Sequence, residues 1–261
     1  MEIFSNNAFN HKSAIIIGGA GDIGAEIAIQ FSKVGTHKIA LLDKDTSGLN
    51  KVARQLKNTT SQVLQIEVDL ADENSIQQAV KNLYADFKDW NVLVTTAGVF
   101  KGGTLIDLKA DDWDKLMAIN ARAIFLSSRL IAEKMIAIGG GKIIHVGSSS
   151  TYYGTPGSGA YAASKVVINQ LTQTMAVEWG SHNIQVNTIC PTVTETKFLE
   201  FVTGDILHEQ FRERLKQRMP LKRLLKPSDI APTVLFLASD GSQFINGAII
   251  PIDGGARLVS T

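Results

Sequence analysis

This sequence is poor in cysteine, in net charge and in long apolar runs, and each shortage excludes a class of protein. The single cysteine, Cys190, excludes an internal disulfide and a metal cluster of cysteines, and it is best interpreted as a buried structural thiol. The net charge of +1, without a dense block of lysine and arginine, gives no reason to expect nucleic acid or an anionic membrane as a partner. No apolar run is long enough to cross a membrane, and the polar segment 1–11 does not resemble a signal peptide, so we expect a cytoplasmic protein.

No internal repeat and no linker rich in proline or serine divides the chain, which predicts one domain over residues 1–261. Short apolar runs alternate with amphipathic patterns along its whole length. The runs predict seven strands, at 14–17, 38–42, 62–68, 91–95, 142–146, 184–189 and 248–251. The amphipathic segments predict helices at 47–57, 71–87, 110–138, 161–179 and 228–238. This alternation predicts an α/β fold, doubly wound, with a mainly parallel sheet and helices on both faces.

A glycine-rich segment, Gly18 to Gly24, follows the first predicted strand and precedes a helical pattern. In this arrangement free backbone N–H groups and a helix N-terminus can hold a pyrophosphate. Asp43 ends the second predicted strand, nineteen residues after Gly24. A carboxylate there can accept hydrogen bonds from an adenosine ribose and repel a 2′-phosphate. We therefore interpret the segment as part of a dinucleotide site rather than as a simple loop.

Tyr161 and Lys165 are four residues apart in a helical pattern, and Ser148 precedes Tyr161 by thirteen residues. Residues at i and i+4 share a helix face, and a nearby ammonium favours the phenolate, so the pKa of Tyr161 is expected to fall from about 10 towards the working pH. Alone this pair is a weak signal, because exposed pairs of this kind contribute little. Its weight comes from convergence at the predicted strand ends, where the further candidates are Gly18 to Gly24, Asp43, Asp69, Ala97, Gly98 and Ser148.

Together these residues resemble the short-chain dehydrogenase/reductase family over positions 12–255. The family's glycine turn matches 17–24, its two strand-end acidic residues match Asp43 and Asp69, and its Asn-Asn-Ala-Gly motif matches 95–98. The family's catalytic asparagine, serine, tyrosine and lysine match Asn120, Ser148, Tyr161 and Lys165. Its late Pro-Gly segment and following threonine match Pro191-Thr192 and Thr196, and its terminal strand and turn match 251–255.

The resemblance implies a Rossmann fold and reversible hydride transfer between a nicotinamide cofactor and an alcohol/carbonyl pair, with no metal. Tyr161 would take the hydroxyl proton, Lys165 would lower its pKa and bind the nicotinamide ribose, and Ser148 would stabilise the substrate oxygen. Asn120 would hold a water that links Lys165 to solvent. The implied cofactor-binding residues are Gly18, Gly21, Asp22, Ile23, Gly24, Asp43, Asp69, Leu70, Ala97, Gly98, Tyr161, Lys165, Pro191, Thr194 and Thr196. The family also implies a homotetramer or homodimer that pairs helices 110–138 and 161–179.

Four departures from the family pattern affect the expected cofactor geometry. Ile17 replaces the threonine of the glycine turn, and a hydroxyl from Thr95 or Thr96 could compensate for it. Asp22 replaces the second glycine, and we expect its carboxylate to cap free N–H groups at the helix start and to point away from the phosphates. Thr95-Thr96 replaces the two asparagines, and Thr192 replaces the glycine after Pro191.

Asp43, together with Gly21 where NADP-dependent relatives often carry a basic residue, favours NAD over NADP, although Lys44 could partly offset Asp43. For the substrate we expect a sugar, polyol or sugar acid, contacted by Ser148, Ser150, Tyr153, Tyr161 and Val193. Further candidates for the pocket wall are Tyr152, Glu195 and, in a lid around 192–220, Phe198, Leu199 and Phe201. Two other substrates remain open, a 3-oxoacyl thioester, for which Arg212, Arg214, Arg218 and Arg223 could bind a carrier's phosphate, and a hydroxysteroid. A non-catalytic NAD sensor is the alternative from a different functional class.

Overall fold

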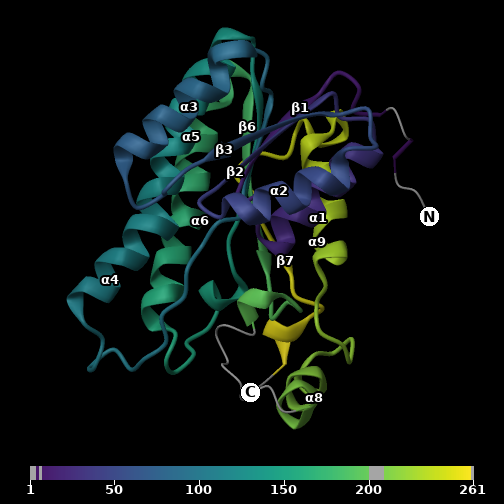
Figure 1. Cartoon of the computed structure of the whole chain (residues 1–261). Helices are drawn as coiled ribbons and strands as arrows, with labels where there is room; N and C mark the ends of the chain where they lie inside the picture. The colour runs from purple at the N-terminus through teal and green to yellow at the C-terminus, as the bar shows by residue number, and fades with distance from the viewer. Residues whose placement is uncertain (1–3, 6–7, 200–208, 260–261) are drawn as a thin grey trace.

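The computed structural model describes residues 4–5, 8–199 and 209–259. Seven strands form one parallel sheet in the order β3-β2-β1-β4-β5-β6-β7 (Figure 1). Their bounds are β1 Ser13–Ile17, β2 Lys38–Asp43, β3 Gln62–Glu67, β4 Val92–Thr95, β5 Gly141–Val146, β6 Ile184–Pro191 and β7 Ile249–Ile252. The prediction of seven strands in a doubly wound parallel sheet is confirmed, and most of the observed ends lie within two residues of the predicted ones.

Helices cover both faces of the sheet. They are α1 Asp22–Lys33, α2 Thr46–Leu56, α3 Glu73–Asp86, α4 Ala110–Met117, α5 Ala123–Ala137, α6 Gly159–Trp179, α8 Glu209–Arg218 and α9 Pro227–Ala238. Short 3₁₀ turns lie at Ser149–Thr151, Gly180–His182, Asp240–Ser242 and Ala256–Leu258. No helix among the described residues combines the length and the apolar character that a membrane crossing requires.

The strands divide their side chains between two cores. Ile16 of β1 points into a core closed by α1, α2 and α9, whereas its neighbours Ile15 and Ile17 point into a core closed by α3, α5 and α6. Figure 1 shows the two helix layers on either side of the sheet. Because both faces are covered, the central strands such as β1 and β4 are buried and mostly apolar, as the sequence pattern indicated, whereas the edge strand β3 exposes Gln62, Gln65 and Glu67.

The predicted helix 110–138 is not one regular helix. A π-helical turn, Ala118–Arg122, separates α4 from α5 and contains Asn120. Such a turn holds one residue more than an α-helical turn, and turns of this kind occur frequently at functional sites. A second difference lies in the expected lid, where α8 forms a regular helix that the sequence pattern did not predict.

The glycine turn brings three backbone segments together at the carboxyl end of β1. A Cβ on Gly24 would lie 2.2 Å from Gly18 O, and a Cβ on Gly18 would lie 2.5 Å from the Ala97 amide nitrogen. Gly18 also has a φ of +88°, which side-chain-bearing residues rarely adopt. The strand, the helix and the loop after β4 therefore approach one another as closely as bare backbone allows.

Replacing Gly24 with alanine is expected to destabilise the fold. The new methyl group would strike backbone rather than a movable side chain, so we expect a loss of about 1–3 kcal/mol in the free energy of unfolding, measured by denaturant titration. The control is Gly21→Ala, whose Cβ would lie 3.5 Å from Gly18 O, an ordinary contact. Equal stability of the two variants would show that the close approach does not constrain the fold.

Candidate active site

A cavity of about 1290 Å³ opens at the carboxyl ends of the strands. Every residue predicted to bind cofactor or substrate lines it, and so do the catalytic candidates Ser148, Tyr161 and Lys165. Asn120 does not line the cavity but is buried beside it. The structure therefore brings the residues named by the strand-end rule together around one cavity, while their individual roles stay predictions.

The N-terminus of α1 forms one end of this cavity. The first N–H groups of a helix have no carbonyl in a preceding turn to bond, and Asp22, Ile23 and Gly24 occupy these positions in α1 and line the cavity. Gly21 precedes these residues and has no side chain that could cover their N–H groups. Bare amides at a helix N-terminus fit the pyrophosphate of a dinucleotide.

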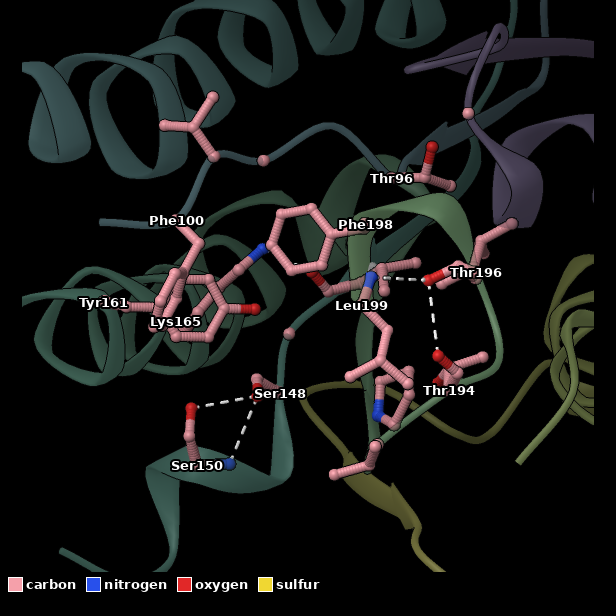
Figure 2. Close-up of a pocket in the computed structure, with 18 of the residues that line it drawn as sticks. Thr96, Phe100, Ser148, Ser150, Tyr161, Lys165, Thr194, Thr196, Phe198 and Leu199 are labelled. Carbon is pink, nitrogen blue, oxygen red and sulfur yellow. Dashed lines mark hydrogen bonds between the residues drawn. The ribbon is translucent and has the colours of Figure 1, made fainter. Parts of the chain in front are cut away.

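Ser148 follows β5, and the turn after it fixes its hydroxyl. The Ser150 amide N–H and the Ser150 hydroxyl both donate to Ser148 Oγ, at 3.2 and 2.9 Å (Figure 2). With both lone pairs engaged, the Ser148 hydroxyl keeps its proton to give to another oxygen. Ser150, which was expected to contact substrate, therefore also orients Ser148.

Tyr161 and Lys165 lie one turn apart on α6, as predicted, but the expected effect of Lys165 on Tyr161 is wrong for this arrangement. Lys165 Nζ donates to Val146 O at 3.1 Å and lies 5.9 Å from the centre of the Tyr161 ring. Burial raises the pKa of Tyr161 to about 12, although hydrogen bonding to Ser148 lowers it. Burial also lowers the pKa of Lys165 to about 8, because removal from water disfavours each charged form. Tyr161 is thus a phenol in this structure, ready to give a proton rather than to take one.

Asn120 connects the loop after β4 to α6 through its amide. Its Nδ2 donates to Val99 O at 2.9 Å and to Ser164 Oγ at 3.0 Å, and its Oδ1 accepts from the Val99 N–H at 2.8 Å. Both amide protons are used, so a water could bond only the remaining lone pair of Oδ1 or the main chain. The role of Asn120 in holding a water stays a prediction, while its role in fixing the active-site loop is visible.

The hypothesis that a threonine hydroxyl compensates for Ile17 is confirmed for Thr96. Its Oγ1 lies 3.1 Å from Ile17 O and 3.0 Å from Gly18 O, so it ties the glycine turn to the end of β4. Thr95 instead lies 2.9 Å from His145 Nδ1, in the interior of the sheet. Within the described part of the chain, the buried hydroxyl of Thr192 has no partner.

The expected capping role of Asp22 is wrong. Gly21 is the N-cap of α1, and no side chain caps the helix. Asp22 Oδ2 instead accepts a hydrogen bond from the main-chain N–H of Lys197, at 2.6 Å. The carboxylate turns towards the segment after β6 because an unpaired N–H is available there.

Asp43 is anchored at the end of β2 by two backbone groups. Its Oδ2 accepts from the Ala20 N–H at 3.2 Å and its Oδ1 from the Asp45 N–H at 3.1 Å. Asp45, which also lines the cavity, accepts from the Gly48 N–H, and this bond, followed by that of Ser47, lowers the pKa of Asp45. Two fixed carboxylates therefore stand at this end of the cavity, with Lys44 between them in sequence.

Aromatic rings surround Tyr161. The Phe100 ring packs edge-on at 5.3 Å between centroids, and Phe198 lies at 6.4 Å. In Figure 2, Phe198 lies between Tyr161 and Lys165 on one side and Thr196 on the other. Phe198 and Leu199 line the cavity as predicted, and Phe201 lies outside the described residues. Glu195 and Tyr152 are not among the lining residues, since Glu195 pairs with Arg212 and Arg257 lies over the Tyr152 ring.

Several lining residues were missed by the sequence analysis. Phe100 follows a strand end by a few residues, and the loop 154–158 lies between Ser148 and Tyr161, so both could have been found by their neighbours. The expected lid around 192–220 contains α8, but no sequence signal singles out its lining residues apart from Arg218, and none places the C-terminal segment at the site. From these two segments the cavity receives Leu215, Arg218, Met219, Ala256, Arg257 and Val259.

The arrangement can hold an oxygen atom and exchange a proton with it. Ser148 offers a hydroxyl proton, Tyr161 offers a phenol, and Lys165 supplies a buried cation whose pKa is close to physiological pH. Within the described residues no group of three or more histidine, cysteine, aspartate or glutamate side chains is placed to hold a metal ion.

Known proteins match this chain over almost its whole length. A family model described as enoyl-(acyl carrier protein) reductase matches residues 18–257. A 3-oxoacyl-acyl-carrier-protein reductase of Thermotoga maritima is 32% identical, with 94% of this chain and 97% of the relative covered. D-threitol dehydrogenase of Mycolicibacterium smegmatis is 34% identical, covering 95% and 93%. An NAD-dependent glycerol dehydrogenase of Listeria innocua is also 34% identical, covering 95% and 94%.

Two solved structures are similarly close. Levodione reductase superposes with a TM-score of 0.91 at 28% identity, covering 97% of this chain and 100% of its own. A gluconate 5-dehydrogenase from Burkholderia cenocepacia, in complex with NADP and tartrate, has a TM-score of 0.90 at 27% identity, covering 98% and 99%.

The high pKa of Tyr161 predicts opposite pH dependences for the two directions of an alcohol/ketone reaction at this site. Oxidation requires the phenolate, so its kcat/KM is expected to rise about tenfold per pH unit from pH 6 to 8. The rise becomes shallower above about 8, where Lys165 loses its charge. Reduction uses the phenol and stays level over this range, because Tyr161 remains protonated up to about 12.

Initial rates in both directions across this pH range test the assignment, with Lys165→Met as the companion variant. This variant is expected to lose the change of slope near pH 8. A plateau of the oxidation rate already at pH 7 in the unaltered enzyme would contradict the high pKa of Tyr161.

Proposed function

The chain belongs to the short-chain dehydrogenase/reductase family, enzymes that transfer hydride between a nicotinamide cofactor and an alcohol or ketone, and we propose that it acts on a sugar, polyol or sugar acid with NAD. The observation that carries the substrate proposal is the set of hydroxyl-bearing side chains beside Tyr161. They line one stretch of the cavity at Ser148, Ser149, Ser150, Tyr153, Thr155 and Ser158. Hydroxyls that both donate and accept suit a substrate that carries several hydroxyl groups.

The relatives support the same class of substrate. By their names, D-threitol dehydrogenase and glycerol dehydrogenase act on polyols, and the structural neighbour from Burkholderia acts on gluconate. Phe100 and Phe198 add apolar surface beside Tyr161. The C–H groups of a sugar or polyol can pack against this surface.

The proposal of NAD rests on the carboxylates of Asp43 and Asp45. Both line the end of the cavity beyond the glycine turn, where the adenosine ribose would lie, and a 2′-phosphate there would meet two negative charges. The NAD-dependent glycerol dehydrogenase supports this choice, while the NADP bound to the gluconate 5-dehydrogenase shows that a similar fold accepts the other cofactor. Lys44 also lies at the cavity wall, where its ammonium opposes the two carboxylates.

In the proposed mechanism the N-terminus of α1 would hold the pyrophosphate of the cofactor, Asp43 would hold the adenosine ribose, and Lys165 would hold the nicotinamide ribose. The nicotinamide ring, when bound, supplies the hydride acceptor. Ser148 donates its proton to the substrate oxygen and fixes it near Tyr161 Oη. Tyr161 then takes the hydroxyl proton during oxidation, or returns it during reduction. Lys165 would stabilise the phenolate only after its ammonium leaves Val146 O, because in this structure it does not lower the pKa of Tyr161.

Two alternatives have less support. A 3-oxoacyl thioester reductase, like the Thermotoga relative, would use free arginines for a carrier's phosphate, yet Arg212 and Arg223 are paired with Glu195 and Asp229. Arg218 lines the cavity and keeps this alternative testable. A non-catalytic NAD sensor would not need Ser148, Tyr161 and Lys165 on one cavity wall.

We also propose that the enzyme is a cytoplasmic homotetramer, assembled through α5 and α6. These helices carry apolar side chains on their outer faces, with Phe125 39%, Val166 47% and Val177 84% exposed. Ile124 of α5 is instead buried within the protein. We further propose that residues 192–220 cover the substrate as a lid.

Replacing Tyr161 with phenylalanine should abolish turnover while leaving cofactor binding intact. We expect a fall in kcat of at least about 100-fold with NAD and whichever polyol, sugar or sugar acid is oxidised fastest, followed as NADH absorbance. The matched control is Tyr84→Phe, which removes a buried hydroxyl that has no hydrogen-bond partner among the described residues and does not line the cavity. Turnover only with hydroxysteroids or 3-hydroxyacyl thioesters would overturn the proposed substrate class.

Replacing Asp43 with alanine should shift cofactor preference towards NADP. Removal of the carboxylate eliminates the repulsion of a 2′-phosphate and the bonds to the ribose, so the ratio of kcat/KM for NAD to that for NADP should fall by about tenfold or more. The ratio is measured with a common substrate at constant ionic strength. A preference for NADP in the unaltered enzyme would contradict the proposal directly.

A further inference from the structure

Asp22 lies where the family's glycine turn has a glycine, and its carboxylate joins two segments that are 175 residues apart in sequence. It accepts the main-chain N–H of Lys197 at 2.6 Å, a short distance for an N–H···O bond. Lys197 belongs to the segment 192–199, which we call the strap. Both residues line the cofactor cavity, so their hydrogen bond joins the start of α1 to the strap at the cavity wall.

The strap is fixed at its other edge by regular backbone bonds. The Glu195 N–H donates to Leu225 O at 2.8 Å, the Leu225 N–H donates to Val193 O at 3.2 Å, and the Thr192 N–H donates to Ile252 O at 3.2 Å. Internally, the Thr196 hydroxyl donates to Thr194 O at 3.3 Å and accepts from the Leu199 N–H at 3.4 Å (Figure 2). The Leu199 N–H also donates to Thr196 O at 3.0 Å. Backbone hydrogen bonds to Ile252 and Leu225 thus hold the first part of the strap, and Asp22 holds its later part at Lys197.

The bond also explains how a carboxylate is tolerated beside a pyrophosphate site. An unpaired Asp22 would repel the phosphates that the first N–H groups of α1 are placed to bind. The hydrogen bond turns Oδ2 towards the strap and partly neutralises its charge. The Lys197 ammonium adds positive charge over the same end of the cavity, where it also contributes, after the larger hydrogen bonds from Gly48 and Ser47, to lowering the pKa of Asp45.

We propose that Asp22 is a positioning residue that latches the strap over the bound dinucleotide, so that its bond to the Lys197 N–H must open before the cofactor leaves. The inference rests on the assignment of this cavity to the cofactor. Phe198 follows Lys197 directly and lies 6.4 Å from the Tyr161 ring. The same latch therefore places an aromatic wall of the substrate pocket, which links cofactor retention to substrate binding.

The latch is tested by the dissociation rate of the reduced cofactor, followed by stopped-flow fluorescence after displacement. Asp22→Ala removes the acceptor, and Lys197→Pro removes the donor N–H at a position where proline is tolerated because a helical turn begins there. Each variant should release NADH about tenfold faster, the usual effect of losing a hydrogen bond to a charged group. The double variant should be no faster than either single one, because both remove the same bond.

Two further variants separate the latch from general effects. Glu26→Gln neutralises a carboxylate one turn further along α1 that bonds Gln30 and does not line the cavity, so its release rate should match the unaltered enzyme. Lys197→Ala removes the ammonium but keeps the N–H, so it should accelerate release less than Lys197→Pro. The KM for NAD should rise in Asp22→Ala by a larger factor than any change in kcat.

Release from Asp22→Ala at the rate of the unaltered enzyme would overturn the latch. So would additive effects of Asp22→Ala and Lys197→Pro, or an effect of Lys197→Ala as large as that of proline. If the unaltered protein bound neither NADH nor NADPH in the same titration, the cofactor assignment itself would fail. Binding without a change in Asp22→Ala would overturn the latch alone.

Discussion

The site depends on the contact between bare backbones at the carboxyl end of β1. Gly24 of α1 and the loop after β4 both approach Gly18 at distances that leave no room for a Cβ. This contact lies between β1 and β4, where the strand order reverses direction and a crevice opens in a doubly wound sheet. Thr96, which follows β4, adds a hydroxyl to the same junction. The family usually supplies this hydroxyl from the position of Ile17, at the end of β1. The cofactor end of the cavity is therefore a consequence of packing, while the catalytic end is set by β5 and α6.

Burial moves the two central ionisable groups in opposite directions on the pH scale. The pKa of Tyr161 rises and that of Lys165 falls, so burial disfavours the charged form of each group, although Lys165, with a pKa of about 8, is still mainly an ammonium at neutral pH. The two groups do not offset one another, because Lys165 Nζ is directed at Val146 O. Lys165 Nζ nevertheless lies close enough to the Tyr161 ring that its charge could stabilise the phenolate if the ammonium left Val146 O. The electrostatics of catalysis are thus governed by where the ammonium points as much as by the spacing of four residues on α6.

Most of the architecture could be predicted from the sequence because buried parallel strands are apolar throughout and end in polar or glycine-rich segments. The residues at these ends, from Asp43 to Ser148, could be assigned to one site by the same rule. Features that depend on distant partners could not be predicted. The carboxylate of Asp22 bonds Lys197, the π-helical turn at Asn120 depends on contacts with Val99 and Ser164, and α8 has too little apolar periodicity to be recognised. The pKa of Tyr161 was misjudged because spacing on a helix does not reveal desolvation.

The π-helical turn at Ala118–Arg122 takes up one extra residue without turning the helices on either side of it out of phase. By closing hydrogen bonds over one residue more than an α-turn, it fits this residue into about the same rotation, so Ile131 and Met135 of α5 remain buried against the sheet. The extra residue is accommodated where Asn120 bonds Val99 and Ser164. Loss of one residue from this turn would therefore alter the active-site loop while leaving the packing of α5 largely in place.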